Sequence, residues 1–392
     1  MDFMTSGIIL KSGKEKIFHQ KHHWIFSGAI KSFPSNFSEG KIIPIYSEKN
    51  ELLGHGYFNS KTSLSGRIVS FGNIEPEKAI LQNIKNAIFL RKELFDDKKT
   101  NAYRLINGEG DLLPGLIVDK YSDYLVIQIS TLGMEKIKPL IVSYLTSLIS
   151  TKGIYEKSLL SCRKEEGLEP FEGTLFGDIP DEVEILENGI KFLISFKKGQ
   201  KTGFYLDQRE MRSLIGSFAD GKKILNCFCY TGGFSIYALK NSAALVDSID
   251  ISSPALDLAL KNTSINGLAP SSFICEDVFK FLKEKDSLNY DIVILDPPAF
   301  AKKKKDIIQA CKGYKEINRE TIKKMPKNSF LLTCSCSYHV DEVLFQKVVF
   351  QAAEEAKRNV KIISKHRLAL DHTINLFHPE GNYLKSLFLF IE

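Results

Sequence analysis

Hydrophobic positions in the first part of the chain fall into short runs that turn signals interrupt. In order, the runs are GIIL, WIFSGAI, KIIPIYS, LLGHGYFN and SGRIVSF, and glycine, proline or polar clusters separate them. Short apolar runs with such boundaries are typical of β-strands. We therefore expect residues 1–72 to form a small all-β barrel or sheet.

The pattern changes after residue 72. The acidic, proline-containing segment NIEPEK opens a stretch in which apolar residues recur at helical spacing, at positions 80, 81, 84, 87 and 88. The runs RLINGEGDLLPGLIVDKY and YLVIQIS then indicate strands around a turn, and a further helix extends to about residue 149. Residues 73–190 are therefore predicted to form an α+β middle domain, and we find no obvious catalytic constellation in its sequence.

Beyond the segment FKKGQKTGFYLDQREMRSLI, apolar runs alternate with helical patterns. The predicted strands are KILNCFC, LVDSIDI, SSFICED, YDIVILD and SFLLTCSCS, and helical stretches such as ALDLALKNTSING lie among them. This alternation predicts a doubly wound α/β domain with a parallel sheet over residues 191–392. In such folds ligands bind at the carboxyl ends of the strands, so the residues that follow each strand are the candidates for function.

The first two strand ends indicate an adenosine-containing cofactor. The stretch NCFCYTGGF joins the first strand to a helix, and Gly232 and Gly233 allow the backbone to approach a ligand at the start of that helix. About 17 residues later Asp250 closes the second strand, where an acidic side chain accepts hydrogen bonds from ribose hydroxyls.

Three further features favour S-adenosylmethionine over a dinucleotide. The full dinucleotide fingerprint needs a glycine where this chain has Tyr230, because a pyrophosphate must nearly touch the backbone. Asp277 follows the third strand, well placed for an adenine amine, and the fourth strand ends in Asp296-Pro297-Pro298. Each carboxylate alone fits a surface position or a helix cap. Together, in strand order, they indicate a methyltransferase site.

Length, charge and cysteine content change the picture only slightly. A chain of 392 residues agrees with two or three domains, and its net charge of +6 permits a polyanionic partner without requiring one. The start MDFMTSGIILKSGKEK lacks the apolar run of a signal peptide, and no run is long enough for a membrane span, so we expect a cytoplasmic protein without a membrane partner. An odd total of seven cysteines in a reducing compartment indicates free thiols.

Two basic stretches are candidates for contact with nucleic acid. The first contains Lys14 and Lys21 and leads into the aromatic Trp24, a mixture that suits a phosphate backbone and a stacking surface. A solvated edge around a core tryptophan fits that pattern equally well. The second is the run Lys302, Lys303, Lys304 after DPPAF, which is either a phosphate contact at the mouth of the site or a solvated loop.

At this point the chain resembles a known family, the class I methyltransferases of large-subunit ribosomal RNA that carry a PUA domain and make 5-methylcytosine. The similarity rests on KHHWIFSGAI, RLINGEGDLLPGLIVDKY, KTGFYLDQRE, ILNCFCYTGGFS, DPPAFAKKKK, CKGYKEIN, the SCS of TCSCS and HPEGNYLK, and so covers nearly the whole chain. The resemblance implies a PUA-like barrel that grips 23S ribosomal RNA and a Rossmann-like domain that binds S-adenosylmethionine. A homodimer is compatible with the sequence, which does not determine the oligomeric state.

The resemblance also implies site residues by position. The segment KTGFYLDQRE would wrap over the cofactor, and we call it the wrapping segment. Further contacts would come from the glycine loop, NCFCYTGG, and from the strand ends. The residues implied are Tyr205, Asp207, Asn226, Phe228, Thr231, Gly232, Asp250 and Asp277. Asp296 would lie at the junction with the target base, and Cys336 would be the catalytic cysteine. Related enzymes with two catalytic cysteines carry one after a proline of the fourth-strand motif, where this chain has Ala299.

Strand geometry separates the two cysteines of LLTCSCSYHV. Residues two apart in a strand share a face, so Cys334 and Cys336 point the same way, and Cys336 is nearer the carboxyl end where a base must lie. Cys334 is better explained as a small buried residue. A zinc site with Cys227 and Cys229 is rejected, because in the usual strand order the fourth strand separates the two pairs by about 10 Å.

Three other functions stay open from the sequence. An RNA amino-group methyltransferase would share DPPAF but has no need of Cys336. A 5-methyluracil enzyme would use the same thiol chemistry, although many of those carry an N-terminal cysteine cluster and residues 1–161 here contain no cysteine. A non-catalytic ribosome-assembly factor would retain the fold without the chemistry.

Overall fold

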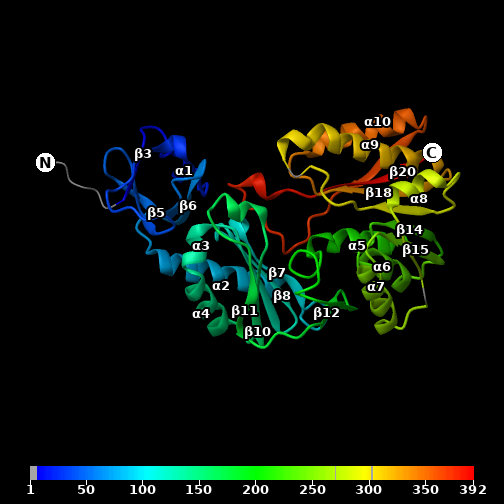
Figure 1. Ribbon diagram of the computed structural model, residues 1–392, viewed down its shortest axis with the longest axis horizontal. Helices are drawn as coiled ribbons and strands as arrows, with labels where there is room; N and C mark the ends of the chain where they lie inside the picture. Colours follow the sequence, from blue (N-terminus) through cyan, green and yellow to red (C-terminus); the bar gives the residue numbers. More distant parts are fainter. Residues whose placement is uncertain (1–6, 270, 302) are drawn as a thin grey trace. The chain divides into compact units, whose positions relative to one another are not determined.

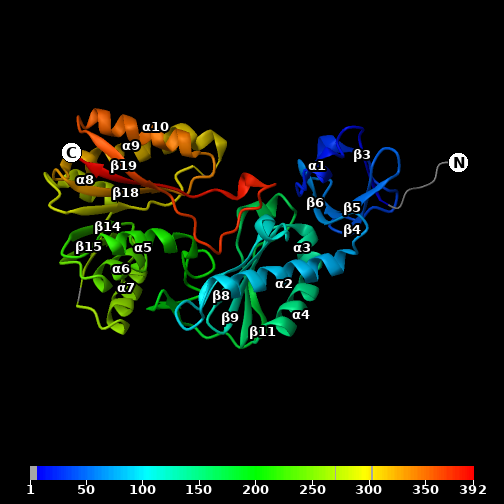
Figure 2. The ribbon, with the colours of Figure 1, turned by 180° about the vertical axis from the view of Figure 1, so that it is seen from behind.

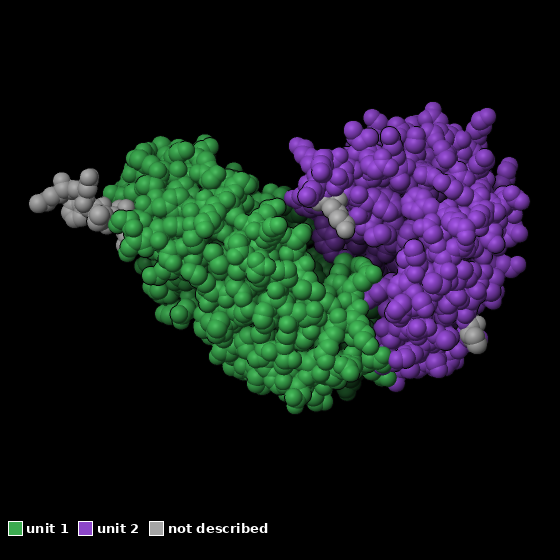
Figure 3. Space-filling model, viewed as in Figure 1, with its two compact units in different colours: residues 1–189, 194–206, 370–381 green, residues 190–193, 207–369, 382–392 purple. Residues whose placement is uncertain are grey.

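The computed structural model describes residues 7–269, 271–301 and 303–392. Their contacts divide them into two compact units (Figure 3). The first contains the described residues up to 189 together with 194–206 and 370–381, and the second contains 190–193, the described part of 207–369, and 382–392. No helix within these ranges is long and apolar enough to cross a membrane.

The first unit begins with a six-stranded sheet in the order β2-β6-β5-β4-β1-β3. Its elements are β1 (Ile8–Leu10), α1 (Lys16–His19), β2 (Trp24–Phe26), β3 (Ile30–Ser32), β4 (Ile42–Tyr46), β5 (Leu52–Phe58) and β6 (Leu64–Phe71). Every run that was predicted to be a strand contains one. The alternating inward residues of these strands form one buried cluster, which includes Ile8, Leu10, Ile25, Ile45, Phe58 and Ile68.

A five-stranded sheet in the order β11-β10-β9-β8-β7 follows in the same unit (Figure 1). Its elements are α2 (Pro76–Leu94), β7 (Ala102–Asn107), β8 (Leu116–Tyr121), β9 (Tyr124–Ile129), α3 (Leu132–Lys136), α4 (Lys138–Leu148), β10 (Gly153–Ser158) and β11 (Phe171–Gly177). The α+β arrangement predicted for this stretch is confirmed. The chain then forms β12 (Val183–Glu187) and β13 (Ile190–Ile194).

Buried arginines attach the late segment 370–381 to this unit. Arg91 makes a bidentate pair with Asp111, at 2.6 and 2.7 Å, and its Nη2 also donates to the carbonyl of Asp371 at 2.7 Å. The backbone N–H of Arg104 donates to the Asp371 carboxylate, also at 2.7 Å. Hydrogen bonds to charged groups are stronger than neutral ones, especially where water is excluded. The hydrogen bonds to Asp371 therefore hold segment 370–381 against Arg91 and Arg104, although these residues lie far from it in the sequence.

The second unit is built on a seven-stranded sheet in the order β16-β15-β14-β17-β18-β20-β19. Its strands are β14 (Lys223–Cys227), β15 (Leu245–Asp250), β16 (Ser272–Cys275), β17 (Ile292–Leu295), β18 (Ser329–Ser335), β19 (Val360–Lys365) and β20 (Lys385–Ile391). The five predicted strands run parallel to one another, and β17 separates β14 from β18 as expected. The expectation of a purely parallel sheet is wrong, because β20 runs antiparallel to both β18 and β19.

Helices cover both faces of this sheet (Figures 1 and 2). They are α5 (Arg209–Ser217), α6 (Gly233–Lys240) and α7 (Ser253–Ile265) on one face, and α8 (Val278–Glu284), α9 (Ile307–Lys324) and α10 (Glu342–Glu355) on the other. Each face has its own buried core, one with residues of α5 and α6 and the other with residues of α8, α9 and α10. This two-sided burial leaves the carboxyl edge of the sheet as the place for polar side chains.

His23 gives the first unit a pH-dependent stability. The imidazole is wholly buried with its Nδ1 2.8 Å from the carbonyl of Ile68, and burial lowers its pKa. The unfolded state therefore binds more protons as the pH falls below about 6.5, so the free energy of unfolding decreases on acidification. His23→Asn retains a side-chain N–H close to the Nδ1 position but cannot titrate, and should make this decrease shallower. Urea unfolding followed by the fluorescence of Trp24, the single tryptophan, measures it. Equal pH slopes in the two proteins would contradict the assignment.

Candidate active site

The loop between β14 and α6 holds a strained backbone at the carboxyl edge of the sheet. Phe228 and Tyr230 have positive φ angles of 59° and 48°, and Gly232 has a φ of 80° directly before α6. Bulky residues rarely adopt this conformation, and such outliers cluster at ligand sites. The loop leads into the N-terminus of α6, which is the arrangement expected for a ligand-binding turn. A side chain at Gly232 would also meet Ala259 of α7 at 3.1 Å.

Asp250 at the end of β15 fits the ribose of an adenosine cofactor. One carboxylate oxygen accepts the N–H of Tyr230 at 2.8 Å and the other accepts the N–H of Ser252 at 2.9 Å. A carboxylate has about four acceptor positions, so two backbone bonds fix its orientation and leave capacity for two hydroxyl donors. The side chain is half-buried, which leaves it within reach of a ligand. The donor and acceptor chemistry therefore suits S-adenosylmethionine.

Other cofactor candidates take different positions. Asn226 is buried, and its amide donates to Ser235 Oγ at 2.8 Å, so it supports the loop from beneath. Thr231 is also buried, and its carbonyl accepts from Asn262. Asp277 caps α8 by accepting the N–H of Lys280 at 2.8 Å, the cap role considered above, and remains exposed at the end of β16.

The wrapping segment contributes to both units. Tyr205 belongs to the first unit, where its hydroxyl donates to Gln200 and its ring lies 4.3 Å from the Lys201 ammonium. Asp207 belongs to the second unit, is buried, and accepts a hydrogen bond from the hydroxyl of Tyr383. That bond joins the segment KTGFYLDQRE to the segment HPEGNYLK.

Asp296 is oriented by a residue that sequence reasoning missed. It follows β17, is half-buried, and accepts a hydrogen bond from the side-chain amide of the buried Gln208 at 3.0 Å. Gln208 is adjacent to Asp207 in the motif KTGFYLDQRE. The motif that contains Gln208 was therefore recognised in the sequence, but the hydrogen bond from Gln208 to Asp296 was not predicted.

Cys334 and Cys336 occupy the two depths that strand geometry predicts. Cys334 is wholly buried, and burial, together with the nearby carboxylate of Asp296, holds the pKa of its thiol well above the usual range. Cys336 is half-buried just beyond the end of β18, and its thiol donates to the carbonyl of Pro297 at 3.8 Å. A thiolate is the nucleophilic form of cysteine, so Cys334 is unsuited to chemistry at neutral pH. Cys336 lies directly beside the Asp296-Pro297 turn.

Ser337 connects the loops that carry these two groups. Its Oγ accepts the N–H of Ala301, beyond the DPPAF turn, at 3.1 Å and lies 2.9 Å from the hydroxyl of Tyr314 on α9. The serine is buried, and so is Tyr314. These contacts hold the residue directly after Cys336, and neither Ser337 nor Tyr314 was singled out from the sequence beyond the motif matches SCS and CKGYKEIN.

Comparison with known proteins identifies the family. The profile of the S-adenosylmethionine-dependent methyltransferases matches residues 171–358, and that of PUA-like domains matches residues 8–71. A ribosomal RNA large subunit methyltransferase I from Aeromonas hydrophila is 39% identical, with 98% of this chain and 99% of that protein covered. One from Alteromonas mediterranea is 40% identical, with 98% of each covered. The chain belongs to the ribosomal RNA large subunit methyltransferase I family.

The fold agrees with solved structures of methyltransferases. A methyltransferase crystallised with SAH is 26% identical and superposes with a TM-score of 0.83, over 98% of this chain and 100% of that one. A methyltransferase from Streptococcus mutans is 25% identical with a TM-score of 0.82 and the same coverage. The cofactor of this methyltransferase is therefore S-adenosylmethionine, and the PUA-like and Rossmann-like parts predicted from the sequence are confirmed.

The candidate RNA-binding residues of this methyltransferase differ in exposure. Lys14 and Lys21 are exposed on the PUA-like domain, and Lys303 and Lys304 are exposed after the DPPAF turn; Lys302 lies outside the described residues. Trp24 is half-buried, and its indole N–H donates to Glu109 at 2.9 Å.

These contacts favour a structural role for Trp24 over base stacking. Its ring also packs edge-on against His378 with the centroids 4.4 Å apart. On the same strand Phe26 is 53% exposed, so it is the aromatic side chain with an accessible surface.

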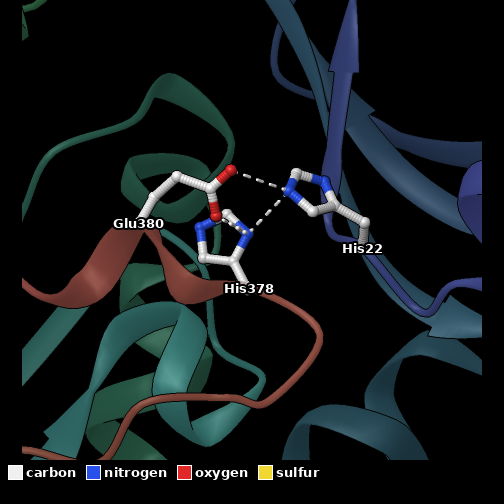
Figure 4. Close-up of side chains that lie close together, drawn as sticks. All are labelled: His22, His378 and Glu380. Atoms are coloured by element: carbon white, nitrogen blue, oxygen red, sulfur yellow. Dashed lines mark hydrogen bonds and ion pairs between the residues drawn. The ribbon is translucent and has the colours of Figure 1, made fainter.

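A cluster of potential metal ligands lies in the first unit (Figure 4). His22 Nε2 is 3.3 Å from Glu380 Oε1 and 3.1 Å from His378 Nδ1. The opposite ring nitrogen of His22 accepts the N–H of Trp24 at 3.2 Å, so the proton of the neutral ring resides on Nε2. A protonated Nε2 donates to its neighbours but does not bind a metal. The cluster is therefore explained as a hydrogen-bond network that joins β2 to the segment 370–381.

Asp250 provides a direct test of the cofactor site. Asp250→Ala should weaken S-adenosylmethionine binding by about 10- to 100-fold, since hydrogen bonds to a charged acceptor contribute about 1.5–3 kcal/mol each. Isothermal titration calorimetry measures the change. Asp247→Ala is the matched control, because Asp247 lies on the same strand and bonds the hydroxyl of Tyr290 instead. Equal affinities of wild type and Asp250→Ala would rule out the ribose contact.

Proposed function

We propose that this methyltransferase modifies carbon 5 of a cytosine in large-subunit ribosomal RNA, through a covalent intermediate on Cys336. The observation that carries the proposal is the position of the Cys336 thiol, 3.8 Å from the carbonyl of Pro297 and next to Asp296 at the carboxyl edge of the sheet. The relatives named above are described as acting on large-subunit ribosomal RNA, and the PUA-like domain carries exposed lysines suited to a phosphate backbone.

The chemistry explains why a cysteine is needed. Carbon 5 of cytosine is a poor nucleophile, and addition of a thiolate to carbon 6 turns it into an enamine-like centre with a usable electron pair. S-adenosylmethionine supplies an electrophilic methyl group. After methyl transfer a base takes the proton from carbon 5. The electron pair of that carbon–hydrogen bond restores the double bond between carbons 5 and 6, and the carbon–sulfur bond breaks to release the Cys336 thiolate. An exocyclic amine has a lone pair of its own and needs no such addition.

Asp296 is proposed to hold the base during this sequence. Its carboxylate would accept from the cytosine amine, which orients the base, or from a protonated ring nitrogen, whose positive charge it stabilises while the protonated ring accepts the thiolate. The Gln208 amide fixes one oxygen of that carboxylate, so the group is oriented before the base arrives. Asp250, Asp277 and the loop of Phe228, Thr231 and Gly232 are proposed to contact the cofactor, with Asn226 and Asp207 supporting them. Tyr205 remains a candidate for the same site.

The two cysteines of β18 and its exit allow a matched test. Cys336→Ala should reduce methyl transfer to ribosomal RNA by about a thousandfold or more, as the loss of a covalent nucleophile does. Cys334→Ala should reduce methyl transfer far less than Cys336→Ala, because the buried Cys334 thiol contacts Gln208 and Asp296 but is unsuited as a nucleophile. Labelled cofactor and ribosomal RNA from cells lacking the enzyme measure the rates, and calorimetry should show cofactor binding unchanged in both variants.

Bisulfite sequencing of the same RNA identifies the product. A single protected cytosine is expected after incubation with the wild-type protein. Label in the RNA without a protected cytosine, or full activity of Cys336→Ala, would favour an amino-group methyltransferase. Absence of both label and cofactor binding in the wild type would favour an assembly factor.

A further inference from the structure

Lys385 is a buried lysine that binds the backbone directly after the proposed nucleophile. It begins β20 and pairs with Ser335 across the antiparallel ladder to β18, directly before Cys336. Only 6% of the residue is exposed. Its ammonium donates to the carbonyl of Ser337 at 2.8 Å and to that of Tyr383 at 2.7 Å. The first of these bonds holds the residue that follows Cys336, so the lysine helps to fix the exit of β18.

The charge of Lys385 interacts with those of Cys336 and Asp341. Burial lowers the pKa of Lys385, while the negative forms of Cys336 and of Asp341, at the start of α10, raise it. Tyr314 of α9 and Cys334 of β18 are also affected by a charge on Cys336, and both are buried neutral groups. Asp296 contributes a negative charge. Lys385 is the positively charged member of this set of groups, whereas Asp296 and Asp341 are negatively charged. A positive charge near a cysteine favours its thiolate form over the thiol.

We propose that Lys385 is a positioning residue for the methyl transfer: its ammonium holds the Ser337 carbonyl and stabilises Cys336 as a thiolate. In this role the lysine acts through its charge and its donor groups, and it takes no part in adding to the base or in removing the carbon 5 proton. This inference rests on the proposed function, in which Cys336 is the nucleophile. The antiparallel strand β20 brings Lys385 to the exit of β18.

The test is the pH dependence of alkylation at Cys336. The full-length protein is treated with iodoacetamide over a range of pH, and mass spectrometry of peptides gives the rate at Cys336 and, as an internal reference, at the exposed Cys275. Lys385→Met removes both the charge and the donor. Lys385→Gln removes the charge but keeps a donor for one carbonyl, and it carries the test if the methionine variant does not fold. Lys324→Met is the matched control, because Lys324 also donates to two backbone carbonyls, of Leu282 and Lys283.

Loss of the charge should move the alkylation midpoint of Cys336 upward by about one pH unit, which lowers the rate at neutral pH about tenfold. We expect the same shift in Lys385→Met and Lys385→Gln, a parallel shift in the acid limb of the methylation rate, and no shift in Lys324→Met or at Cys275. An unchanged midpoint in Lys385→Gln would overturn the proposal and leave the lysine a structural donor.

The two proposals fail in different ways. If Cys336→Ala methylates RNA at the normal rate, the covalent function is wrong, whatever the alkylation profile shows. If Cys336→Ala is inactive and Lys385→Gln leaves both the alkylation midpoint and the methylation profile unchanged, only the role of Lys385 is wrong.

Discussion

The site depends on the parallel pairing of β17 with β18. That pairing aligns Leu295 with Thr333, so the turn after β17 and the exit of β18 emerge at the same edge of the sheet. Asp296 and Cys336 are 40 residues apart in sequence, yet hydrogen bonding between two strands brings their loops together. The backbone ladder therefore sets the spacing between an oriented carboxylate and a thiol, and side-chain contacts only refine it.

Burial then separates two residues of the same type. Cys334 lies within β18 and Cys336 lies just beyond its end, so only the second reaches the carboxyl edge. Removing a thiolate from water is costly, and this cost raises the pKa of the Cys334 thiol. Two positions along the chain therefore separate the buried Cys334 from the proposed nucleophile, Cys336.

The sequence predicted those features that depend on local periodicity. Strand alternation identified the parallel strands, the depth of Cys336 and the acidic residues at the strand ends. It did not predict Gln208 beside Asp296 or Lys385 beside Ser337, because both contacts join segments that are distant in the chain. The antiparallel insertion of β20 follows from the packing of the apolar run KSLFLFI between two strands, and no local pattern distinguishes that from a parallel edge. Trp24 was ambiguous for the same reason, since its partners Glu109 and His378 come from other parts of the first unit.

The most direct measurement of the central claim is covalent trapping with RNA that contains 5-fluorocytidine. Fluorine at carbon 5 cannot leave as a proton does, so after methyl transfer the carbon–sulfur bond persists. Incubation with S-adenosylmethionine followed by mass spectrometry of peptides should give one RNA adduct, at Cys336. An adduct at another cysteine, or its absence under conditions in which unmodified RNA is methylated, would contradict the account.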